Sequence, residues 1–143
     1  MMYSVAALLL CLPFLAHGYR YTKCGLADAL RRENIPEREL HKWVCMAEYE
    51  SSFNTLATHV NRGGSSTDYG LFQINSLWNC DPKDGRRTRN GCGHPCSDFQ
   101  NTDLSDDVAC INKLRKWHRG WGFSYGYKAH CQDKTSAYLS ECK

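Results

Sequence analysis

Apolar residues recur every three to four positions between residue 37 and about residue 53. This spacing places side chains on one face of a helix, and it is carried by Leu40, Trp43, Val44 and Ala47. The pattern predicts a helix over this segment with one buried face. Glu50 continues the same stripe near the end of the helix. An acidic side chain is therefore expected on a face that is otherwise apolar.

Two further helices follow from the same kind of pattern. Residues 26–32 are typical of a short helix. Another helix is predicted at Ser105, which we expect to be its N-cap. Asp106 and Asp107 would then lie in the first turn, where acidic side chains are favourable. The apolar face of this helix would consist of Leu104, Val108, Ile111 and Leu114.

The rest of the chain has the composition of strands, turns and loops. In residues 57–76 the hydrophobic period shifts toward that of strands, and glycine, serine and threonine indicate turns. Residues 79–101 are dense in glycine, proline and cysteine and predict a loop. A shorter helical segment is expected before Cys131. The fold class that follows is α+β: a mostly helical domain with a small antiparallel β-sheet.

The first residues have the pattern of a secretory signal. Residues 5–15 form an apolar run too short to cross a bilayer, and Ala16-His17-Gly18 resembles a small-x-small cleavage site. We expect residues 1–18 to be a signal peptide and residues 19–143 to form one secreted, extracellular domain. No later stretch is apolar enough to span a membrane.

The chain has nine cysteines, and Cys11 lies in the expected signal peptide. An even set remains in a secreted chain, which predicts four disulfides and leaves their pairing open. Zinc binding is the competing interpretation, but no Cys-x-x-Cys pair is present. The remaining cysteines are Cys24, Cys45, Cys80, Cys92, Cys96, Cys110, Cys131 and Cys142.

The net charge of the chain is +3. This mild excess fits attraction to an anionic polymer and falls short of what nucleic-acid binding requires. The basic runs at residues 86–89 and 113–119 are interpreted as solvated surface. No nucleic-acid partner is expected, and a monomer is the expected state.

Two carboxyl groups lie in contrasting surroundings. Glu50, on an apolar stripe, loses hydration, which disfavours its charged form. Residues 63–70 are typical of a polar, glycine-rich turn, and Asp68 within it is expected to stay ionised. One protonated and one ionised carboxyl group are what glycoside hydrolysis requires. Taken alone, a glutamate on a helix face is more often just a partly buried acid, so the surrounding motifs matter.

Those motifs resemble a known family. Residues 45–55 (Cys-Met-Ala-Glu-Tyr-Glu-Ser-Ser-Phe-Asn-Thr) and residues 66–76 (Ser-Thr-Asp-Tyr-Gly-Leu-Phe-Gln-Ile-Asn-Ser) are similar to the two signature stretches of C-type lysozymes. The resemblance extends over residues 19–143 and includes the cysteine spacing; it fits a secreted, arthropod-like member. It implies the disulfides Cys24–Cys142, Cys45–Cys131, Cys80–Cys96 and Cys92–Cys110.

The resemblance also implies an activity. Glu50 matches the general acid and Asp68 the nucleophile or electrostatic stabiliser of a retaining glycosidase, for which lysozyme is the type case. The implied substrate is bacterial peptidoglycan, cut at the β-1,4 bond after N-acetylmuramic acid, or a chito-oligosaccharide. No cofactor is required for this catalysis.

Four more residues are candidates for substrate binding. Gln73, Asn75 and Trp78 match family positions that line the saccharide cleft. Trp78 would offer an aromatic plane to a sugar ring; a buried core tryptophan is the alternative. Phe123 is the fourth candidate, in an aromatic-rich stretch.

Two cleft positions depart from the family pattern. The residue after Trp78 is usually a second aromatic and is Asn79 here. The position seven before Cys131 is usually a tryptophan packed against the catalytic glutamate and is Ser124 here. Losing this apolar wall is expected to leave Glu50 better hydrated and to move the activity optimum toward acid pH. Trp121, Phe123 and Tyr125 are the candidates for filling the gap.

An acidic segment raises the question of a metal. Asp98, Asn101, Asp103, Asp106 and Asp107 match the calcium loop of α-lactalbumins and calcium-binding lysozymes. The resemblance implies side-chain oxygens from Asn101, Asp106 and Asp107 and backbone carbonyls from Asp98 and Asp103. Asn101 replaces an aspartate, which is expected to weaken binding. The alternative is a helix N-terminus that simply favours negative charge.

Two other functions compete with an active hydrolase. A non-catalytic carbohydrate-binding or α-lactalbumin-like calcium-binding relative would explain the acidic loop and the missing aromatics. A disulfide-rich antimicrobial protein acting by charge alone is weakly supported by a net charge of +3. Retention of both carboxyl groups favours the hydrolase.

Overall fold

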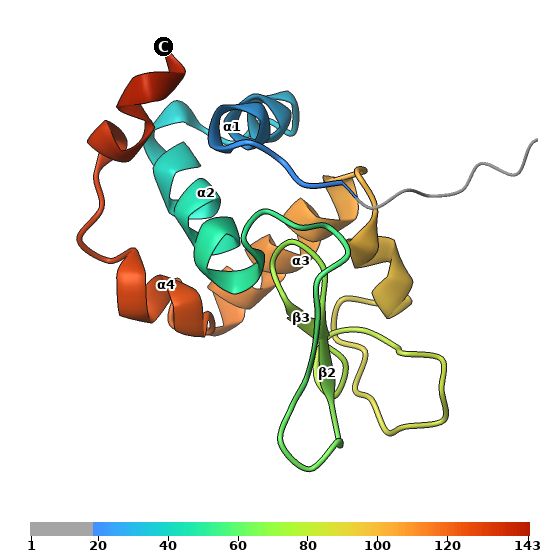
Figure 1. Ribbon diagram of the computed structural model, residues 1–143. Helices are drawn as coiled ribbons and strands as arrows, with labels where there is room; N and C mark the ends of the chain where they lie inside the picture. Colours follow the sequence, from blue (N-terminus) through green and yellow to red (C-terminus); the bar gives the residue numbers. More distant parts are fainter. Residues whose placement is uncertain (1–18) are drawn as a thin grey trace, which may run out of the picture.

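The computed structural model describes residues 19–143 (Figure 1), and the expected signal peptide lies outside the described residues. Its helical elements are α1 (Lys23–Arg32), α2 (Glu37–Ser51), the 3-10 helix η1 (Cys96–Gln100), α3 (Ser105–Trp117), α4 (Tyr125–His130) and the 3-10 helix η2 (Ser136–Cys142). Its strands are β1 (Thr58–Val60), β2 (Thr67–Tyr69) and β3 (Ile74–Asn75). The predicted α+β class, mostly helical with a small antiparallel sheet, is confirmed.

Two predicted helix starts were wrong by a short distance. Helix α1 begins at Lys23 rather than at Leu26, because Thr22 caps it by accepting a hydrogen bond from the backbone N–H of Gly25 at 3.0 Å. Helix α3 begins at Ser105 itself, with Leu104 in the cap position.

Ser105 is therefore not the N-cap of α3. Asp103 takes over part of the capping role: its Oδ1 accepts the Ser105 backbone N–H at 3.0 Å and the Ser105 hydroxyl at 2.6 Å. These bonds hold the pKa of Asp103 below its usual value. The side chain of an aspartate just before the helix satisfies a donor that the cap residue leaves open.

Helix α2 runs through the core. Figure 1 shows it between α4 on one side and α3 on the other. Trp43 has no exposed surface, and its ring packs edge-to-face against Phe72 at 5.7 Å and against Trp121 at 5.4 Å. The buried residues of this helix are Leu40, His41, Trp43, Val44, Cys45, Met46 and Ala47. The predicted apolar stripe is thus the face that meets both the sheet region and the C-terminal part of the chain.

The sheet is antiparallel throughout, in the order β1-β2-β3. Asp68 of β2 is opposite Asn75 of β3 and also opposite His59 of β1. Figure 1 shows the strands and the loop after them projecting from the helical part of the molecule. Asp68 is therefore presented from a small lobe that faces the end of α2.

Four disulfides join the pairs that the resemblance implies. They are Cys24–Cys142, Cys45–Cys131, Cys80–Cys96 and Cys92–Cys110. Two of them hold the segment from residue 79 to residue 101, which was predicted to be a loop and also contains η1. Arg86 in this segment donates to Thr67 Oγ1 at 3.0 Å, so it is not merely solvated surface. No helix among the described residues is both long and apolar enough to cross a membrane.

Gly70, at the end of β2, is where the sheet meets η1. Its φ is +79°, and a Cβ there would lie 1.7 Å from the carbonyl oxygen of Phe99. A side chain at this position would therefore force the sheet lobe away from η1. Left-handed backbone alone costs an L-residue about 1–2 kcal/mol.

We expect Gly70→Ala to lower the free energy of unfolding by about 3–5 kcal/mol, because backbone strain and a backbone clash add together. Urea unfolding followed by circular dichroism measures it. Gly64→Ala is the matched control, since Gly64 has φ +71° and nothing within 4 Å of its added Cβ. Equal losses in the two variants would show that the approach of Phe99 is unimportant.

Candidate active site

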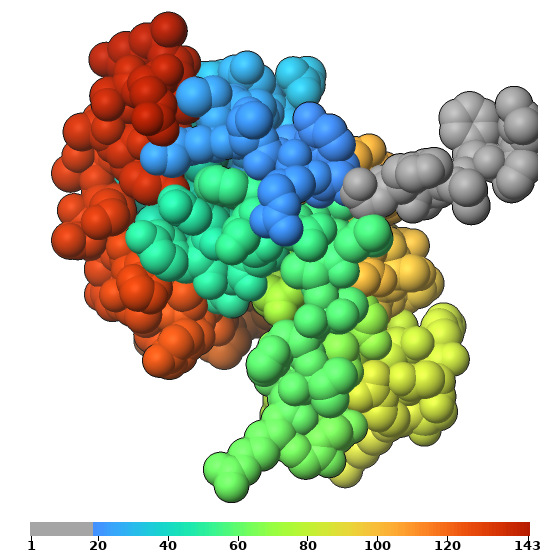
Figure 2. Space-filling view, viewed as in Figure 1, coloured from blue at the N-terminus to red at the C-terminus, as the bar shows by residue number. Residues whose placement is uncertain are grey.

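A cavity of about 690 Å³ lies where the sheet lobe faces the helices. Figure 2 shows the molecule notched between the lobe that carries the strands and the part that contains α4. Pockets of this size commonly bind one extended small ligand. Both candidate carboxyl groups line it, together with Met46, Phe72, Gln73, Ile74, Asn75, Trp78, Asn79, Arg89, Gly91, Leu114, Trp117, His118, Phe123, Ser124 and Tyr125.

Glu50 is presented by the last turn of α2. Its Oε1 accepts a hydrogen bond from the backbone N–H of Gly126 at 3.1 Å and another, shorter one from the hydroxyl of Ser124. Gly126 lies in the first turn of α4, whose N-terminus carries a partial positive charge. One oxygen of the carboxyl group is therefore held by protein donors, and Oε2 is left to act in the cavity.

Ser124 replaces the expected tryptophan wall with a polar contact. Its Oγ accepts the backbone N–H of Tyr127 at 3.1 Å and so caps α4. With that lone pair engaged, the hydroxyl hydrogen points to Glu50. Ser124 is itself only 3% exposed. The loss of the tryptophan thus supplies Glu50 with a buried donor, where the sequence had suggested only greater access of water.

None of the aromatic candidates restores the missing tryptophan. Trp121 is buried and packs on Trp43 and Tyr127, at ring distances of 5.4 and 5.1 Å. Phe123 and Tyr125 do line the cavity, but Tyr125 is 80% exposed. The residue that touches Glu50 from this stretch is Ser124 itself.

Asp68 is oriented by its neighbour across the sheet. The side-chain amide of Asn75 donates to Asp68 Oδ1 at 2.7 Å. The oxygen of the same amide accepts the backbone N–H groups of Leu77 and Trp78, at 2.9 and 3.3 Å. Asn75 therefore holds Asp68 and the turn that carries Trp78 at the same time.

The remaining sequence candidates also line the cavity. The Gln73 amide nitrogen donates to the carbonyls of Gly70 and Ala57, at 3.0 and 3.2 Å, which leaves its oxygen free for a ligand. Trp78 is 51% exposed, so it is not a core tryptophan. Phe123 is partly buried against the core.

Trp117 and His118 also line the cavity, although residues 113–119 were predicted to be solvated surface. Trp117 follows Leu114 by three positions, so it continues the apolar stripe of α3. That periodicity was a usable signal, and the many basic neighbours obscured it.

The acidic segment lies apart from the cavity, at the start of α3. Asp107 is 1% exposed, and neither of its carboxylate oxygens has a hydrogen-bond partner among the described residues. Burial raises the pKa of Asp107 well above its usual value. Asn101 Oδ1 accepts the backbone N–H of Asp103 at 2.9 Å. The segment therefore contains one buried carboxyl group with two free oxygens.

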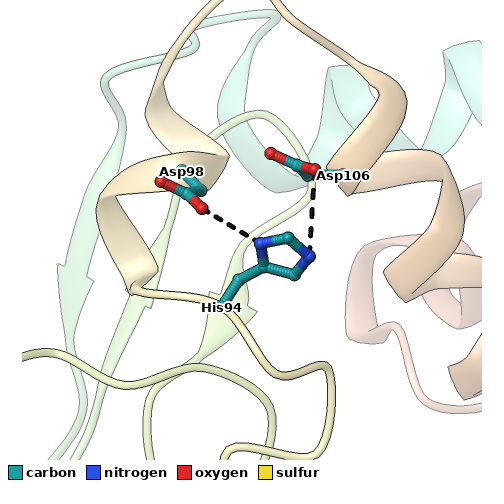
Figure 3. Close-up of side chains that lie close together, drawn as sticks. All are labelled: His94, Asp98 and Asp106. Carbon is teal, nitrogen blue, oxygen red and sulfur yellow. Dashed lines mark hydrogen bonds and ion pairs between the residues drawn. The ribbon is translucent and has the colours of Figure 1, made fainter.

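His94 reaches two other carboxyl groups of the segment (Figure 3). Its Nδ1 is 3.0 Å from Asp98 Oδ2, and its Nε2 is 3.8 Å from Asp106 Oδ1. The two ring nitrogens point in different directions, so one ion cannot bind both. One ligand atom from each of the three residues nevertheless lies within 4.8 Å of the others. Through these contacts the imidazole connects η1 to α3.

Comparison with known proteins gives a consistent result. The C-type lysozyme/alpha-lactalbumin family profile matches residues 19–142. Lysozyme c-1 of Anopheles gambiae is 40% identical over 127 residues, which cover 89% of this chain and 87% of the relative. Lysozyme C-1 of Anas platyrhynchos is 37% identical over 147 residues, with 99% of each chain covered. The crystal structure of lysozyme from Equus asinus superposes with a TM-score of 0.79 at 38% identity, covering 87% of this chain and 99% of that one.

Proposed function

The chain belongs to the C-type lysozyme/alpha-lactalbumin family, and from this premise we propose that it hydrolyses peptidoglycan at the β-1,4 bond between N-acetylmuramic acid and N-acetylglucosamine. The observation that carries the proposal is that Glu50 and Asp68 line one cavity from opposite parts of the fold. Glycoside hydrolysis needs two carboxyl groups on either side of the bond that is cut.

In this proposal Glu50 is the general acid. Oε2 protonates the leaving oxygen of the glycosidic bond, while Oε1 stays bonded to Ser124 and Gly126. The same carboxylate then activates the water that completes hydrolysis. Because two protein donors bind Oε1, the orientation of Oε2 is fixed as well, and less orientational entropy is lost when the substrate reacts.

Asp68 stabilises or captures the positive charge that develops on the sugar ring. Its carboxylate accepts a hydrogen bond from Asn75 at 2.7 Å. Attack on the sugar from this side, followed by attack of water, leads to retention of configuration. Proton NMR of the first product formed tests the stereochemistry.

We propose that the protein acts outside the cell. A segment with the features of a signal peptide precedes the domain, and four disulfides suit an oxidising compartment. We propose a secreted, bacteriolytic and antimicrobial enzyme that acts as a monomer.

Replacement of the general acid is the direct test. We expect Glu50→Gln to reduce turnover of purified peptidoglycan by about 10²–10⁴-fold, since an amide cannot donate the proton. Glu48→Gln is the matched control, because Glu48 lies on the same helix but does not line the cavity. Wild-type protein that binds chito-oligosaccharides without turnover at any pH would contradict the enzymatic proposal and favour a non-catalytic, carbohydrate-binding relative.

Ser124 should orient the general acid. Its hydroxyl donates to Glu50 Oε1, so removal of the bond frees the carboxyl group to rotate away from the glycosidic oxygen. A hydrogen bond to a charged group contributes about 1.5 kcal/mol, which corresponds to about a tenfold change in rate. We expect Ser124→Ala to lower kcat on peptidoglycan by about tenfold.

Ser124→Thr is the control, because threonine keeps both the hydroxyl donor and the helix cap. Thermal melting of both variants separates loss of the cap from the effect on Glu50. Equal kcat values of wild type and Ser124→Ala would show that the hydroxyl does not act on the general acid.

We also propose a structural calcium ion in the acidic segment. Its side-chain ligands would be Asn101, Asp106 and Asp107, joined by the backbone carbonyls of Asp98 and Asp103. The unpartnered, buried carboxylate of Asp107 supports the proposal, since a buried charge without a partner is costly. The contact of Asp106 with His94 and the neutral Asn101 both act against tight binding.

Calcium should raise the melting temperature of chelator-treated protein, because it binds only the folded state. Asn101→Asp adds a charged ligand, and we expect it to increase calcium affinity at least about tenfold. Asp107→Asn should abolish the response. Titration calorimetry measures both. Equal calcium affinity in wild type and Asp107→Asn, or none in wild type and Asn101→Asp alike, would rule the site out.

A further inference from the structure

His94 lies between two carboxyl groups that come from different elements, as Figure 3 shows. Asp98 belongs to η1, and Asp106 belongs to the first turn of α3. All three side chains are partly buried, and one candidate ligand atom from each lies within 4.8 Å of the others. None of these three residues lines the catalytic cavity, so the cluster is separate from the proposed hydrolytic site.

The two ring nitrogens of His94 have different contacts. An ionised carboxylate only accepts hydrogen bonds, so the contact of 3.0 Å between Nδ1 and Asp98 Oδ2 places the ring hydrogen on Nδ1. Nε2 of this tautomer has a lone pair and no hydrogen. Asp106 Oδ1 lies 3.8 Å from it, which is too long for a hydrogen bond. A cation bonded to both atoms would turn this contact between two acceptors into an attraction.

The separation of His94 from α3 is held by the surrounding chain. The His94 backbone N–H donates to Asn90 Oδ1 at 3.0 Å. The disulfide Cys92–Cys110 ties the same segment to α3, the helix that carries Asp106. Ligand side chains that are already positioned lose less conformational entropy when an ion binds.

Asp98 completes an arrangement that is common in metal sites. A histidine that binds zinc through one ring nitrogen usually donates the hydrogen on the other nitrogen to a carboxylate, which fixes the ring and makes the ligating nitrogen more basic. Zinc binds imidazole nitrogen and carboxylate oxygen at about 2.0–2.2 Å, and tetrahedral bonds of this length place two ligand atoms about 3.4 Å apart. The observed 3.8 Å would close to this distance with a small rotation of the Asp106 side chain.

We propose that His94 Nε2 and the carboxylate of Asp106 bind Zn²⁺, with Asp98 orienting the imidazole and water completing the coordination. Calcium and magnesium prefer oxygen ligands, whereas an imidazole nitrogen suits zinc and the neighbouring transition metals. The ion would join the segment before η1 to the start of α3. This site depends neither on the proposed hydrolysis nor on the proposed calcium ion.

The zinc site shares Asp106 with the calcium ligands proposed above. In the structure Asp106 lies near His94, which is the arrangement that zinc would select. Calcium would instead draw Asp106 into a set with Asn101 and Asp107. We therefore expect the two ions to compete, so that zinc lowers the apparent calcium affinity of the wild-type protein.

Titration calorimetry of chelator-treated protein with zinc chloride tests the site. We expect His94→Gln to weaken zinc binding at least about tenfold, because the amide replaces a good nitrogen ligand with a poor one. Asp98→Asn should weaken it by about tenfold to a hundredfold, the effect of losing a carboxylate that orients a ligating histidine. His130→Gln is the matched control, since His130 is an exposed histidine of α4 that is not part of the cluster.

Two variants separate zinc from calcium. His94→Gln should lose zinc binding and retain the calcium response, whereas Asp107→Asn should lose the calcium response and retain zinc binding. Zinc should also raise the melting temperature of the wild type and of His130→Gln, but not that of His94→Gln, because an ion that binds only the folded state stabilises it. Melting of the metal-free variants shows whether each one is folded.

Zinc affinity in both His94→Gln and Asp98→Asn that stays within about twofold of wild type would overturn the site. Zinc binding that is lost in Asp107→Asn but unchanged in His94→Gln would also overturn it, since the ion would then occupy the calcium ligands. Peptidoglycan turnover by His94→Gln should equal that of wild type, so the zinc site and the hydrolase fail on different measurements.

Discussion

Trp43 lies at the centre of the molecule with no exposed surface, and its indole packs edge-to-face on Phe72 in one direction and Trp121 in the other. These contacts join α2 to the sheet region and to the C-terminal segment. Cys45–Cys131 adds a covalent link between α2 and the end of α4. The sheet region and the C-terminal segment both pack on α2. Burial of this helix therefore positions Glu50 relative to Asp68. A shift of α2 would change both walls of the cavity.

The environment of Glu50 depends on that arrangement. Its partners Ser124 and Gly126 lie 74 and 76 residues further along the chain. Ser124 serves two purposes with one oxygen, since it caps α4 and donates to Glu50. Loss of this hydroxyl would therefore remove the cap of α4 and one of the two donors to Glu50 together. Where an indole would act by excluding water, this serine acts by direct hydrogen bonding.

The wall of the cleft that faces α2 combines the small sheet with the long segment before α3. The disulfides Cys80–Cys96 and Cys92–Cys110 anchor the long segment before α3. Gly91 within it supports Trp117, and His94 bridges η1 to the first turn of α3. The acidic segment includes the first turn of α3, and Trp117 is the last residue of the same helix. Binding of an ion at one end of α3 would therefore act on the same helix that carries an indole into the cleft.

Local pattern alone predicted the helices α1 to α4, the α+β class and the position of Glu50 on the buried stripe of α2, because these depend on residues close together in sequence. The cysteine count predicted four disulfides. The 3-10 helix η2 was not predicted, and Asp68, which was expected in a glycine-rich turn, lies in strand β2 instead. Only the tertiary structure decided that Ser124 donates to Glu50, that the Trp117 ring packs over Gly91, and that Asp106 turns toward His94. Helical periodicity reports which residues share a face, but not which distant segment that face will meet. Those pairings arise from close packing of elements far apart in the chain.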